Sequence, residues 1–360
     1  MDDITQIKHN VFASLKPRGL HFCIHGISHS LPFVREYSGE TFFSSFNYWS
    51  NIDNTTWGNV TYVNQSSGVS QNLTYIDPNT GHAIIRVDNT TYIPSAPVVN
   101  RNSVKITTQD AYPIGSLITI DVSHIPYGCS VWPSLWMLGT NMPWPNCGEI
   151  DIIEAINNLG LNQYALHTTP GCNLATNSAQ TGVTLETNCS TAQGCLVQET
   201  KPNSFGSGFA QAGGGVFALQ FDVSGIFFWF WQRSGIPASI FQANSSSNMD
   251  LSDWGTPSAA YPSSSCDIAQ YFQPQQLVID ITLCGIWAGV TSIYDSTGCS
   301  GQCISNVIGS GSSLGNAYWD ISYIRTYLAT AFPSSTATNG TDDGSGSTTS
   351  IVYVQICVLD

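Results

Sequence analysis

The sequence contains few charged residues, and basic residues are the scarcest among them. Only 9% of the 360 residues are Asp, Glu, Lys or Arg, against about 25% in ordinary soluble domains. Lys and Arg number 10 against 24 acids, which leaves a formal net charge of −14. Nucleic acids, anionic lipids and sulfated or uronate-rich polysaccharides require clustered cations, so we expect none of them as partners. A neutral partner fits this composition better.

Long apolar runs are also missing from the chain. No segment reaches the roughly 18–20 consecutive apolar residues that cross a bilayer, so we expect no membrane span. The opening "MDDITQIKHNVFASLKPRG" begins with two acids and has no apolar stretch, so it does not match a signal peptide. We therefore expect residues 1–32 to be an atypical N-terminal segment outside the core of the mature domain.

The cysteines lack the pattern of a metal site. There are 11 of them, with no repeated C-x-x-C pairs and no histidines at the accompanying spacing, which favours disulfides over zinc. The odd number leaves at least one thiol unpaired or paired between chains. The chain also has N-x-S/T sequons that begin at Asn54, Asn59, Asn64, Asn72, Asn89, Asn188, Asn244 and Asn339. Both features belong to an oxidising, secretory environment, so we expect a secreted or cell-wall-associated protein.

The chain is rich instead in short runs of β-branched and aromatic residues. Clusters of Gly, Pro, Asn and Ser separate these runs, which is typical of strands joined by turns. No long segment keeps a 3.6-residue apolar period. The predicted strands are "NVTYVNQ" (59–65), "AIIRVDNTTYI" (83–93), "NSVKITTQ" (102–109), "SLITIDVSHI" (116–125), "EIDIIEAI" (149–156), "QYALHTT" (163–169), "GVFALQFDV" (215–223), "GIFFWFWQR" (225–233), "QLVIDITLC" (276–284) and "YWDISYIRTYL" (318–328). This pattern predicts an all-β fold in which two sheets form a sandwich.

One hairpin and the C-terminal boundary can be placed from composition. Ser224-Gly225 is expected to supply the turn of a hairpin over residues 215–233. After about Leu328 the sequence "TAFPSSTATNGTDDGSGSTTS" is rich in Ser, Thr and Gly and has little to bury. Residues 330–360 are therefore predicted to be a disordered tail, which leaves residues 33–329 as the folded domain.

Three of the few acids lie within six residues of one another, in "NCGEIDIIEAIN" (146–157). Side chains of a strand alternate between its faces, so Glu149 and Asp151 share a face and Glu154 should point to the other. Acids on a strand most often form a solvated face. Here apolar isoleucines flank the acids, and "PYGCSVWPSLWMLGTNMPW" (126–144) supplies aromatic residues just upstream. Acids beside aromatic rings in a chain poor in charge favour a sugar-binding cleft.

A β-bulge would resolve the conflict of faces. One extra residue in a strand moves every later side chain to the opposite face, so a bulge around Ile152-Ile153 would bring Glu154 to the face of Glu149 and Asp151. Five residues of flat strand span roughly 16 Å, so curvature is also needed. Glycoside cleavage with retention requires carboxyl groups about 5–5.5 Å apart, and inversion about 6.5–9.5 Å. The sequence therefore predicts an irregular strand at the candidate site.

"GEIDIIE" (148–154) resembles the active-site strand of glycoside hydrolase family 16, in its laminarinase-like branch with E-x-D-x-x-E spacing. The resemblance extends from about Tyr37 to Tyr327. Segments similar to the fungal secreted endo-β-1,3(4)-glucanases are "PYGCSVWPSLWMLG", "NQYALHTTPGC", "GGGVFALQFD", "GIFFWFWQRSGIP", "DWGTPSAAY", "ITLCGIWAG" and "AYWDISYIRTY". It implies that residues 33–329 are a catalytic domain with a concanavalin A-like β-jelly-roll sandwich of two antiparallel sheets and a concave sugar-binding cleft.

The resemblance also implies a role for each acid. Glu149 corresponds to the nucleophile, Glu154 to the general acid/base, and Asp151 to the middle acid that tunes the nucleophile. Two neighbouring anions raise the pKa of Glu154 toward the working pH, so we expect Glu154 to carry a proton while Glu149 stays ionised. The implied reaction uses no cofactor and no metal.

A set of substrate-binding residues follows from the same resemblance. His167 in "ALHTTP" corresponds to the cleft histidine of the family, although taken alone it would be an ordinary half-buried histidine pinned by a backbone carbonyl. The other positions expected at the cleft are Trp132, Trp136, Trp144, Trp287, Arg101 and Asn102. Where relatives commonly read "INxTxCGDWAG", this chain has "IDITLCGIWAG", so Asp280 replaces an Asn and Ile286 an Asp. If these positions contact sugar, subsite affinity or linkage preference differs.

The leading hypothesis is a secreted, monomeric endo-glycosidase that cleaves β-1,3 or mixed β-1,3/1,4-glucan, a neutral polysaccharide, with net retention. A cell-wall transglycosylase is a second hypothesis, because it resolves the same glycosyl-enzyme with a sugar hydroxyl instead of water. A third, from another class, is a non-catalytic carbohydrate-binding protein, since jelly rolls also occur in lectins. The intact set of three acids argues against this third hypothesis.

Overall fold

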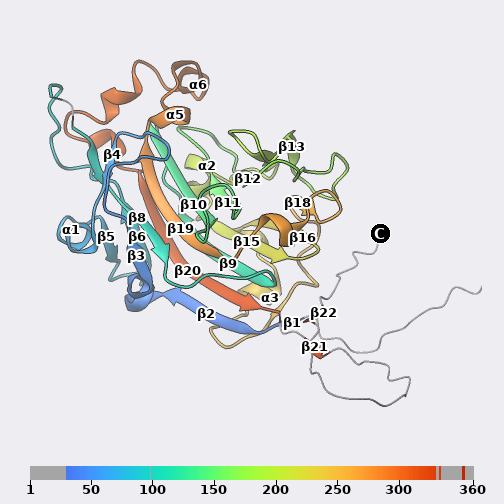
Figure 1. The fold of residues 1–360 in the computed structure, drawn as a ribbon. Helices are drawn as coiled ribbons and strands as arrows, with labels where there is room; N and C mark the ends of the chain where they lie inside the picture. Colours follow the sequence, from blue (N-terminus) through green and yellow to red (C-terminus); the bar gives the residue numbers. More distant parts are fainter. Residues whose placement is uncertain (1–29, 98, 330–331, 334–350, 353–360) are drawn as a thin grey trace, which may run out of the picture.

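Two large antiparallel sheets face each other in the computed structural model, which describes residues 30–97, 99–329, 332–333 and 351–352 (Figure 1). The first, which we call the site sheet, has the order β13 (Val183–Glu186), β14 (Cys195–Gln198), β12 (Gln163–His167), β11 (Glu149–Glu154), β10 (Val131–Gly139), β19 (Gln275–Leu283), β8 (Lys105–Thr108) and β3 (Phe46–Tyr48). The second, the outer sheet, has the order β18 (Ala259–Pro262), β16 (Gly225–Gln232), β15 (Gly215–Asp222), β9 (Ser116–His124), β20 (Tyr318–Leu328), β6 (Ala83–Arg86) and β5 (Thr74–Ile76), with β2 (Phe33–Ser38) beside β20. The predicted all-β sandwich is confirmed.

The remaining elements are short. They include the parallel pair β4 (Val60–Tyr62) and β7 (Arg101–Ser103), the antiparallel pair β1 (Ser30–Leu31) and β17 (Met249–Asp250), and the helices α1 (Gln65–Ser70), α2 (Gly206–Gln211), α3 (Ala238–Phe241), α4 (Ile268–Tyr271), α5 (Gly285–Ala288) and α6 (Thr291–Ser296). Short 3-10 helices are present at η1 (Gly39–Ser45), η2 (Arg233–Gly235), η3 (Cys303–Asn306) and η4 (Ser312–Leu314). None of the helices in the described ranges is long and apolar enough to cross a membrane.

The hydrophobic core lies between the two sheets, because alternate residues of each strand point inward. From the site sheet, Leu135 and Met137 of β10 are fully buried, and from the outer sheet, Ile118 and Ile120 of β9 are fully buried in the same cluster. Burying one such side chain stabilises the fold by about 1.5–3 kcal/mol. The inward faces therefore hold the sandwich together and leave the opposite face of the site sheet available for polar residues.

Every run that the sequence predicts as a strand contains a strand in the structure, and one turn is corrected. β15 and β16 form the expected hairpin, but Asp222 pairs with Gly225, so Val223 and Ser224 form the turn rather than Ser224 and Gly225. Asp222 Oδ1 accepts hydrogen bonds from the N–H and hydroxyl of Ser224. An acid that binds the backbone two residues later favours this placement of the turn.

Four disulfides form within the described residues, as the cysteine pattern predicts, and two of them join segments 170 and 94 residues apart. They are Cys129–Cys299, Cys172–Cys266, Cys189–Cys195 and Cys284–Cys303. Cys147 is buried and unpaired within the described ranges, whereas Cys23 and Cys357 lie outside them. Because Cys299 and Cys303 bond to different partners, their short spacing in the sequence does not mark a metal site.

The chain ends are only partly described. Ser30–Leu31 pair with Met249–Asp250, so the paired strands begin two residues earlier than the boundary expected after residue 32. Within the predicted tail, β21 (Phe332–Pro333) pairs with β22 (Ile351–Val352). Residues 1–29 and the rest of the tail lie outside the described residues. The atypical N-terminal segment and the disordered tail therefore stay predictions.

Candidate active site

β11 contains the bulge that the sequence predicts. Against β10, Leu135 pairs with Ile153 and Trp136 pairs with Asp151, so Ile152 has no partner there. Against β12, the register also shifts between Asp151 and Glu154. The extra residue moves the side chains after it to the opposite face of the strand. Glu154 therefore lies on the face of Glu149 and Asp151, and not on the other face, where a regular strand would place it.

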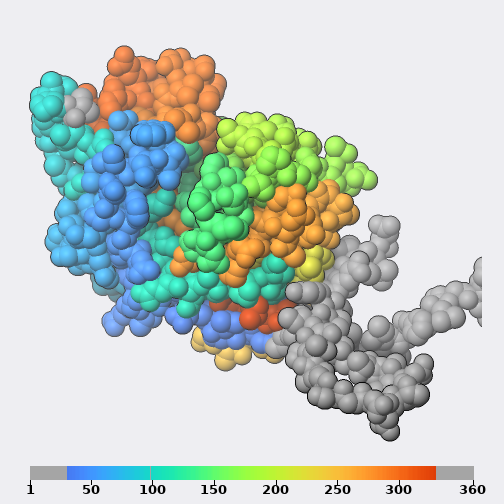
Figure 2. Space-filling view, viewed as in Figure 1, coloured from blue at the N-terminus to red at the C-terminus, as the bar shows by residue number. Residues whose placement is uncertain are grey.

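The three acids consequently share one face of the site sheet. On β10 the residues opposite Glu149, Asp151 and Glu154 are Leu138, Trp136 and Ser134, which alternate with the core residues Leu135 and Met137. This face is recessed in Figure 2, between the N-terminal segment in blue and the segment in green. The isoleucines of β11 take the opposite direction, since Ile150, Ile152 and Ile153 are fully buried in the core.

Glu154 is held by two donors from β10. Trp132 Nε1 donates to Glu154 Oε1 at 2.8 Å, and Ser134 Oγ donates to the same oxygen at 3.1 Å. Both donors lie on the same face of β10 because they are two residues apart. One carboxylate oxygen is therefore fixed, which orients the group. The role of Ser134 was not predicted, although its place between Trp132 and Trp136 in the alternation could have revealed it.

Glu149 and Asp151 converge on His167. Trp144 Nε1 donates to Glu149 Oε2 at 2.9 Å, while His167 Nε2 lies 3.6 Å from Glu149 Oε1 and 3.3 Å from Asp151 Oδ2. His167 Nδ1 is buried and has no hydrogen-bond partner among the described residues. The alternative of a histidine pinned by a backbone carbonyl is therefore wrong, and a role of His167 in binding the substrate stays a prediction.

Burial raises the pKa of all three acids. It is the largest cause in each case, and the pKa values reach about 8 for Glu149, about 8 for Asp151 and about 7 for Glu154. The negative charge of Asp151 adds to the rise at both glutamates, whereas the indole N–H groups of Trp144 and Trp132 oppose it.

The order of these pKa values differs from the expectation of an ionised Glu149 beside a protonated Glu154. Burial and Asp151 raise the pKa of Glu149 at least as far as that of Glu154. Carboxyl groups this close titrate as a set rather than one by one. At neutral pH the set therefore holds protons that it can transfer, which is the property that acid/base chemistry needs.

Four tryptophans predicted at the cleft surround these acids. Trp132 stacks edge-on against Trp287 with ring centroids 5.3 Å apart, and Trp144 is 54% exposed beside Glu149. Trp136 Nε1 donates to Asp280 Oδ2 at 3.0 Å. Exposed and half-exposed indoles can present flat faces to the apolar sides of sugar rings.

Arg101 was expected at the cleft, and this expectation is wrong. Arg101 is fully buried, and its guanidinium donates to the backbone carbonyls of Val307, Thr91 and Gly309 at 2.9–3.1 Å. Asn102 is partly exposed and its Nδ2 donates to Gln71 Oε1 at 2.8 Å, so its place at the cleft stays a prediction. The resemblance carried no information on depth, so it could not distinguish a structural arginine from a binding one.

Asp280 adds a fourth acid to the site sheet. It is buried on β19 opposite Ser134, and Lys105 Nζ lies 3.9 Å from its Oδ2 and 4.9 Å from the centre of the Trp136 ring. Burial raises the pKa of Asp280 to about 6, and Lys105 opposes this rise. Asp280 in turn raises the pKa of Asp151. The acid at position 280, which departs from the family pattern, therefore changes the pKa of one of the three acids of β11.

Glu149, Asp151 and His167 also offer one metal-ligand atom each, all within 4.8 Å of one another. Divalent cations bind ionised carboxylates, whereas burial raises the pKa values of these acids toward neutrality. An indole N–H cannot ligate a metal, yet it occupies one oxygen of Glu149. The arrangement fits proton transfer better than metal binding.

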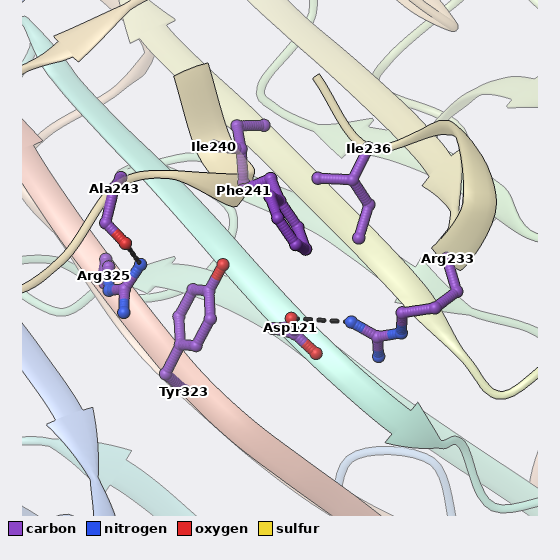
Figure 3. Close-up of a pocket in the computed structure, with 8 residues that line it drawn as sticks. All are labelled: Asp121, Arg233, Ile236, Ile240, Phe241, Ala243, Tyr323 and Arg325. Atoms are coloured by element: carbon purple, nitrogen blue, oxygen red, sulfur yellow. Dashed lines mark hydrogen bonds and ion pairs between the residues drawn. The ribbon is translucent and has the colours of Figure 1, made fainter. Parts of the chain in front are cut away.

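A pocket on the outer sheet is separate from this site (Figure 3). It is lined by Asp121, Arg233, Ile236, Ile240, Phe241, Ala243, Tyr323 and Arg325. Asp121 Oδ2 accepts from Arg233 Nη1 at 2.7 Å, and Arg325 Nη1 donates to the carbonyl of Ala243 at 2.8 Å. Each charged side chain that lines it thus has a partner within the protein, and the pocket contains none of the predicted site residues.

Known proteins share both the sequence and the fold. Residues 46–327 match the family model described as "XgeA-like, catalytic GH16 domain". A probable glycosidase of Schizosaccharomyces pombe is 37% identical over 301 residues, which cover 82% of this chain and 68% of the relative. A probable endo-1,3(4)-beta-glucanase of Neosartorya fischeri is 36% identical over 311 residues, which cover 83% of this chain and 46% of the relative. The chain thus spans less than half the length of this glucanase.

Two solved structures are similar over 83% of this chain and the whole of theirs. One is a laminarinase from Phanerochaete chrysosporium with β-glucans in donor and acceptor sites, at 35% identity and a TM-score of 0.78. The other is an elongating family 16 β-1,3-glucosyltransferase, at 34% identity and a TM-score of 0.75.

Proposed function

Because the chain belongs to glycoside hydrolase family 16, we propose that it is an endo-acting retaining glycosidase that cleaves β-1,3 or mixed β-1,3/1,4-glucan. The observation that supports this most is the bulge at Ile152, which puts Glu154 on the face of Glu149 and Asp151. On a regular strand the acids would lie on opposite faces of the sheet, and no single bond could be reached by both glutamates.

In the first step Glu154 protonates the glycosidic oxygen while a carboxylate oxygen of Glu149 attacks the anomeric carbon. The bond between that carbon and the glycosidic oxygen breaks, the leaving sugar takes the proton, and a glycosyl ester of Glu149 forms. In the second step Glu154 removes a proton from water, and the water oxygen displaces Glu149. Two inversions at one carbon give net retention.

The contacts of the glutamates suit these roles. The indole N–H of Trp144 stabilises the ionised form of Glu149, which must attack as an anion. Charges on Glu149 and Glu154 repel each other, so an ionised Glu149 favours the proton on Glu154. Esterification removes the charge of Glu149, and the pKa of Glu154 then falls, which prepares it to act as a base.

A neutral β-glucan fits the composition and the site. The relatives named above include a probable endo-1,3(4)-beta-glucanase, and the similar laminarinase structure holds β-glucans in donor and acceptor sites. Trp136, Trp144 and Trp287 are exposed or half-exposed and can supply stacking faces, whereas Trp132 is buried and orients Glu154. We further propose that the chain acts as a monomer outside the cell or at the wall. The disulfides, together with the exposed sequon residues Asn54, Asn64, Asn72, Asn188 and Asn244, support this location.

Transfer to a sugar acceptor is the second candidate function. The neighbour described as an elongating β-1,3-glucosyltransferase has the same fold at 34% identity, so the fold accommodates an acceptor sugar in place of water. The three acids and their chemistry would be unchanged, and only the group that resolves the glycosyl-enzyme would differ.

Incubation of the purified protein with laminarin, lichenan and xylan, followed by chromatography, tests these proposals. Short β-gluco-oligosaccharides from laminarin or lichenan, with xylan intact, would support the glucanase. Products longer than a laminari-oligosaccharide substrate would favour transfer. A protein that binds the glucan but does not cleave it would instead be a carbohydrate-binding protein, and this result would refute both enzymatic proposals.

A further inference from the structure

The bulge in β11 creates a backbone problem that the neighbouring strands do not solve. Ile152 has no partner on β10, and the pairing with β12 skips from Asp151 to Glu154. A bulge interrupts the ladder and leaves backbone groups unpaired. Ile152 and Ile153 are fully buried, and a buried N–H or C=O without a partner destabilises the fold. Some other group must therefore satisfy the bulge.

The side-chain amide of Asn162 supplies both missing partners. Its Oδ1 accepts from the N–H of Glu154 at 2.9 Å, and its Nδ2 donates to the C=O of Ile152 at 2.9 Å. A carboxamide holds an acceptor and a donor in one plane, as a peptide group does. The side chain of Asn162 thus stands in for the β12 peptide that would pair here in a regular ladder.

The backbone groups of Asn162 form hydrogen bonds away from β11, on the other side of β12. Its N–H donates to Ser204 Oγ at 3.0 Å, and its C=O accepts from the N–H of Glu199 at 2.9 Å. Asn162 is fully buried, and each of its four polar atoms has a partner. These hydrogen bonds fix the position of Asn162, so its side chain can hold the backbone of β11 in place.

We propose that Asn162 is a positioning residue for Glu154, an inference that rests on the proposed function. By fixing the N–H of Glu154 and the C=O of Ile152, Asn162 stabilises the bulge that turns the Glu154 side chain toward Trp132 and Ser134. Asn162 itself does not touch the reacting atoms in this mechanism. Its loss should harm the step that needs a well-placed proton donor more than the steps that do not.

Asn157 offers a matched control on the same chain segment. It is also fully buried, its Oδ1 accepts from the N–H of Ser130 at 2.8 Å, and its Nδ2 donates to the C=O of Ala288 at 3.2 Å. It therefore makes the same kind of side-chain bonds to the backbone without contacting β11. Its φ is +55°, a conformation that disfavours alanine, so Asn157→Ala removes the amide and also strains the backbone. It is therefore a stringent control for a general loss of stability.

The test compares Asn162→Ala, Asn162→Asp and Asn157→Ala with the wild type on two substrates. Laminarin has a sugar leaving group that must be protonated, whereas a dinitrophenyl β-laminari-oligosaccharide has a leaving group that departs without a proton. We expect Asn162→Ala to lower kcat/KM on laminarin by about 100-fold, within the range of general-acid catalysis, and on the activated glycoside by less than about 10-fold. Asn162→Asp keeps the shape and the acceptor, so its loss should be intermediate. Asn157→Ala should leave the ratio of the two kcat/KM values unchanged.

Three results would overturn the inference. The first is an equal loss on both substrates for the Asn162 variants, and the second is no loss on either. The third is failure of both Asn162 variants to fold while Asn157→Ala folds, which would assign Asn162 to folding alone. A wild-type protein that cleaves neither substrate is a different outcome, because it refutes the proposed function itself.

Discussion

The two sheets treat their acids in opposite ways. On the outer sheet, Asp121 pairs with Arg233 at 2.7 Å (Figure 3), and Glu36 pairs with Arg325 at 2.6 Å. On the site sheet, no arginine within the described ranges contacts the three acids of β11. Their partners are indole N–H groups, a serine and a histidine. Acids paired with guanidinium groups support the fold, whereas buried acids without a cation hold on to protons.

The strands that carry these acids differ in the same sense. β9, which carries Asp121, pairs with β15 without a shift and shifts register only against β20, whereas β11 shifts register against both of its neighbours. A regular strand keeps the alternation that builds the core. The irregular strand gives up part of its ladder, and in return it gathers side chains that regular alternation would separate.

The largest effect is expected from removing either glutamate. Glu149→Gln and Glu154→Gln should each lower kcat on laminarin by about 1,000-fold or more, because nucleophile and general acid/base each contribute on this scale. Asp121→Asn on the outer sheet is the matched control and should change kcat by only a few-fold. Steady-state kinetics measures all three. Near-wild-type activity of either glutamine variant would remove that residue from the mechanism.

Trp132→Phe should have a smaller effect, of about 10-fold in kcat, because it removes only the N–H that orients Glu154. That hydrogen bond lowers the pKa of Glu154. Without it the pKa rises, so the limb of the kcat profile that requires protonated Glu154 moves to higher pH. The pH dependence of kcat measures the shift. Trp229→Phe, which removes an indole bond to Gly255 on the outer sheet, should leave the profile in place, and an unmoved profile for Trp132→Phe would count against the assignment.

Removing an acid should change stability in opposite directions on the two sheets. Folding raises the pKa of Glu149 to about 8, so between about pH 4.3 and pH 8 the folded state binds more protons than the unfolded state, and stability falls as pH rises. Glu149→Gln removes this loss and should be more stable than the wild type near pH 8, by about 1 kcal/mol or more. The difference in stability between the variant and the wild type should vanish as the pH falls toward the pKa of an ordinary glutamate, about 4.3.

Thermal unfolding at several pH values measures this difference. Glu36→Gln on the outer sheet removes a partner of Arg325 and should lower Tm at neutral pH instead. If both variants lose stability at neutral pH, the contrast between the sheets is wrong.

Asp280→Asn, which restores the residue common in relatives, should have a modest effect on kcat. Asp280 raises the pKa of Asp151, so removing its charge lets Asp151 ionise at lower pH. The acidic limb of the activity profile should therefore move to lower pH. The pH profile of kcat/KM checks this shift, and movement toward higher pH would show that the two acids are not coupled as described.

Chelation should have no effect at all. Although Glu149, Asp151 and His167 have the spacing of a metal site, the proposed steps use only proton transfer and attack by a carboxylate. Dialysis against EDTA should leave kcat unchanged, whereas a loss that is restored by one divalent cation would require a different mechanism.

Much of this arrangement could be predicted because alternation is a strict rule in sheets. The same rule that identified the strands exposed the conflict at Glu154, and the conflict located the bulge. β10 was not among the predicted strands, and it contains Pro133, which is unusual within a strand. In the structure Pro133 lies just beyond Ser134, the last residue that pairs with β11, so its missing N–H does not interrupt that pairing.

Other features depend on contacts that no local pattern encodes. Arg101 looked like a cleft residue but donates to carbonyls more than two hundred positions away in the chain, at Val307 and Gly309. Asn162 is the first residue of the segment "NQYALHTTPGC", but its bonds to β11 appear only when β12 is placed beside the bulge. The order of the pKa values was also beyond prediction, because it depends on how deeply each carboxyl is buried.

Proton NMR of the first product released from laminarin tests the central claim most directly, since two glutamates acting on one face by double displacement fix the configuration of the new reducing end. The account predicts that the β-anomer is formed first and that the α-anomer grows in only by mutarotation. An α-anomer released first would mean that water attacks the sugar directly, and it would contradict the role of Glu149 as nucleophile.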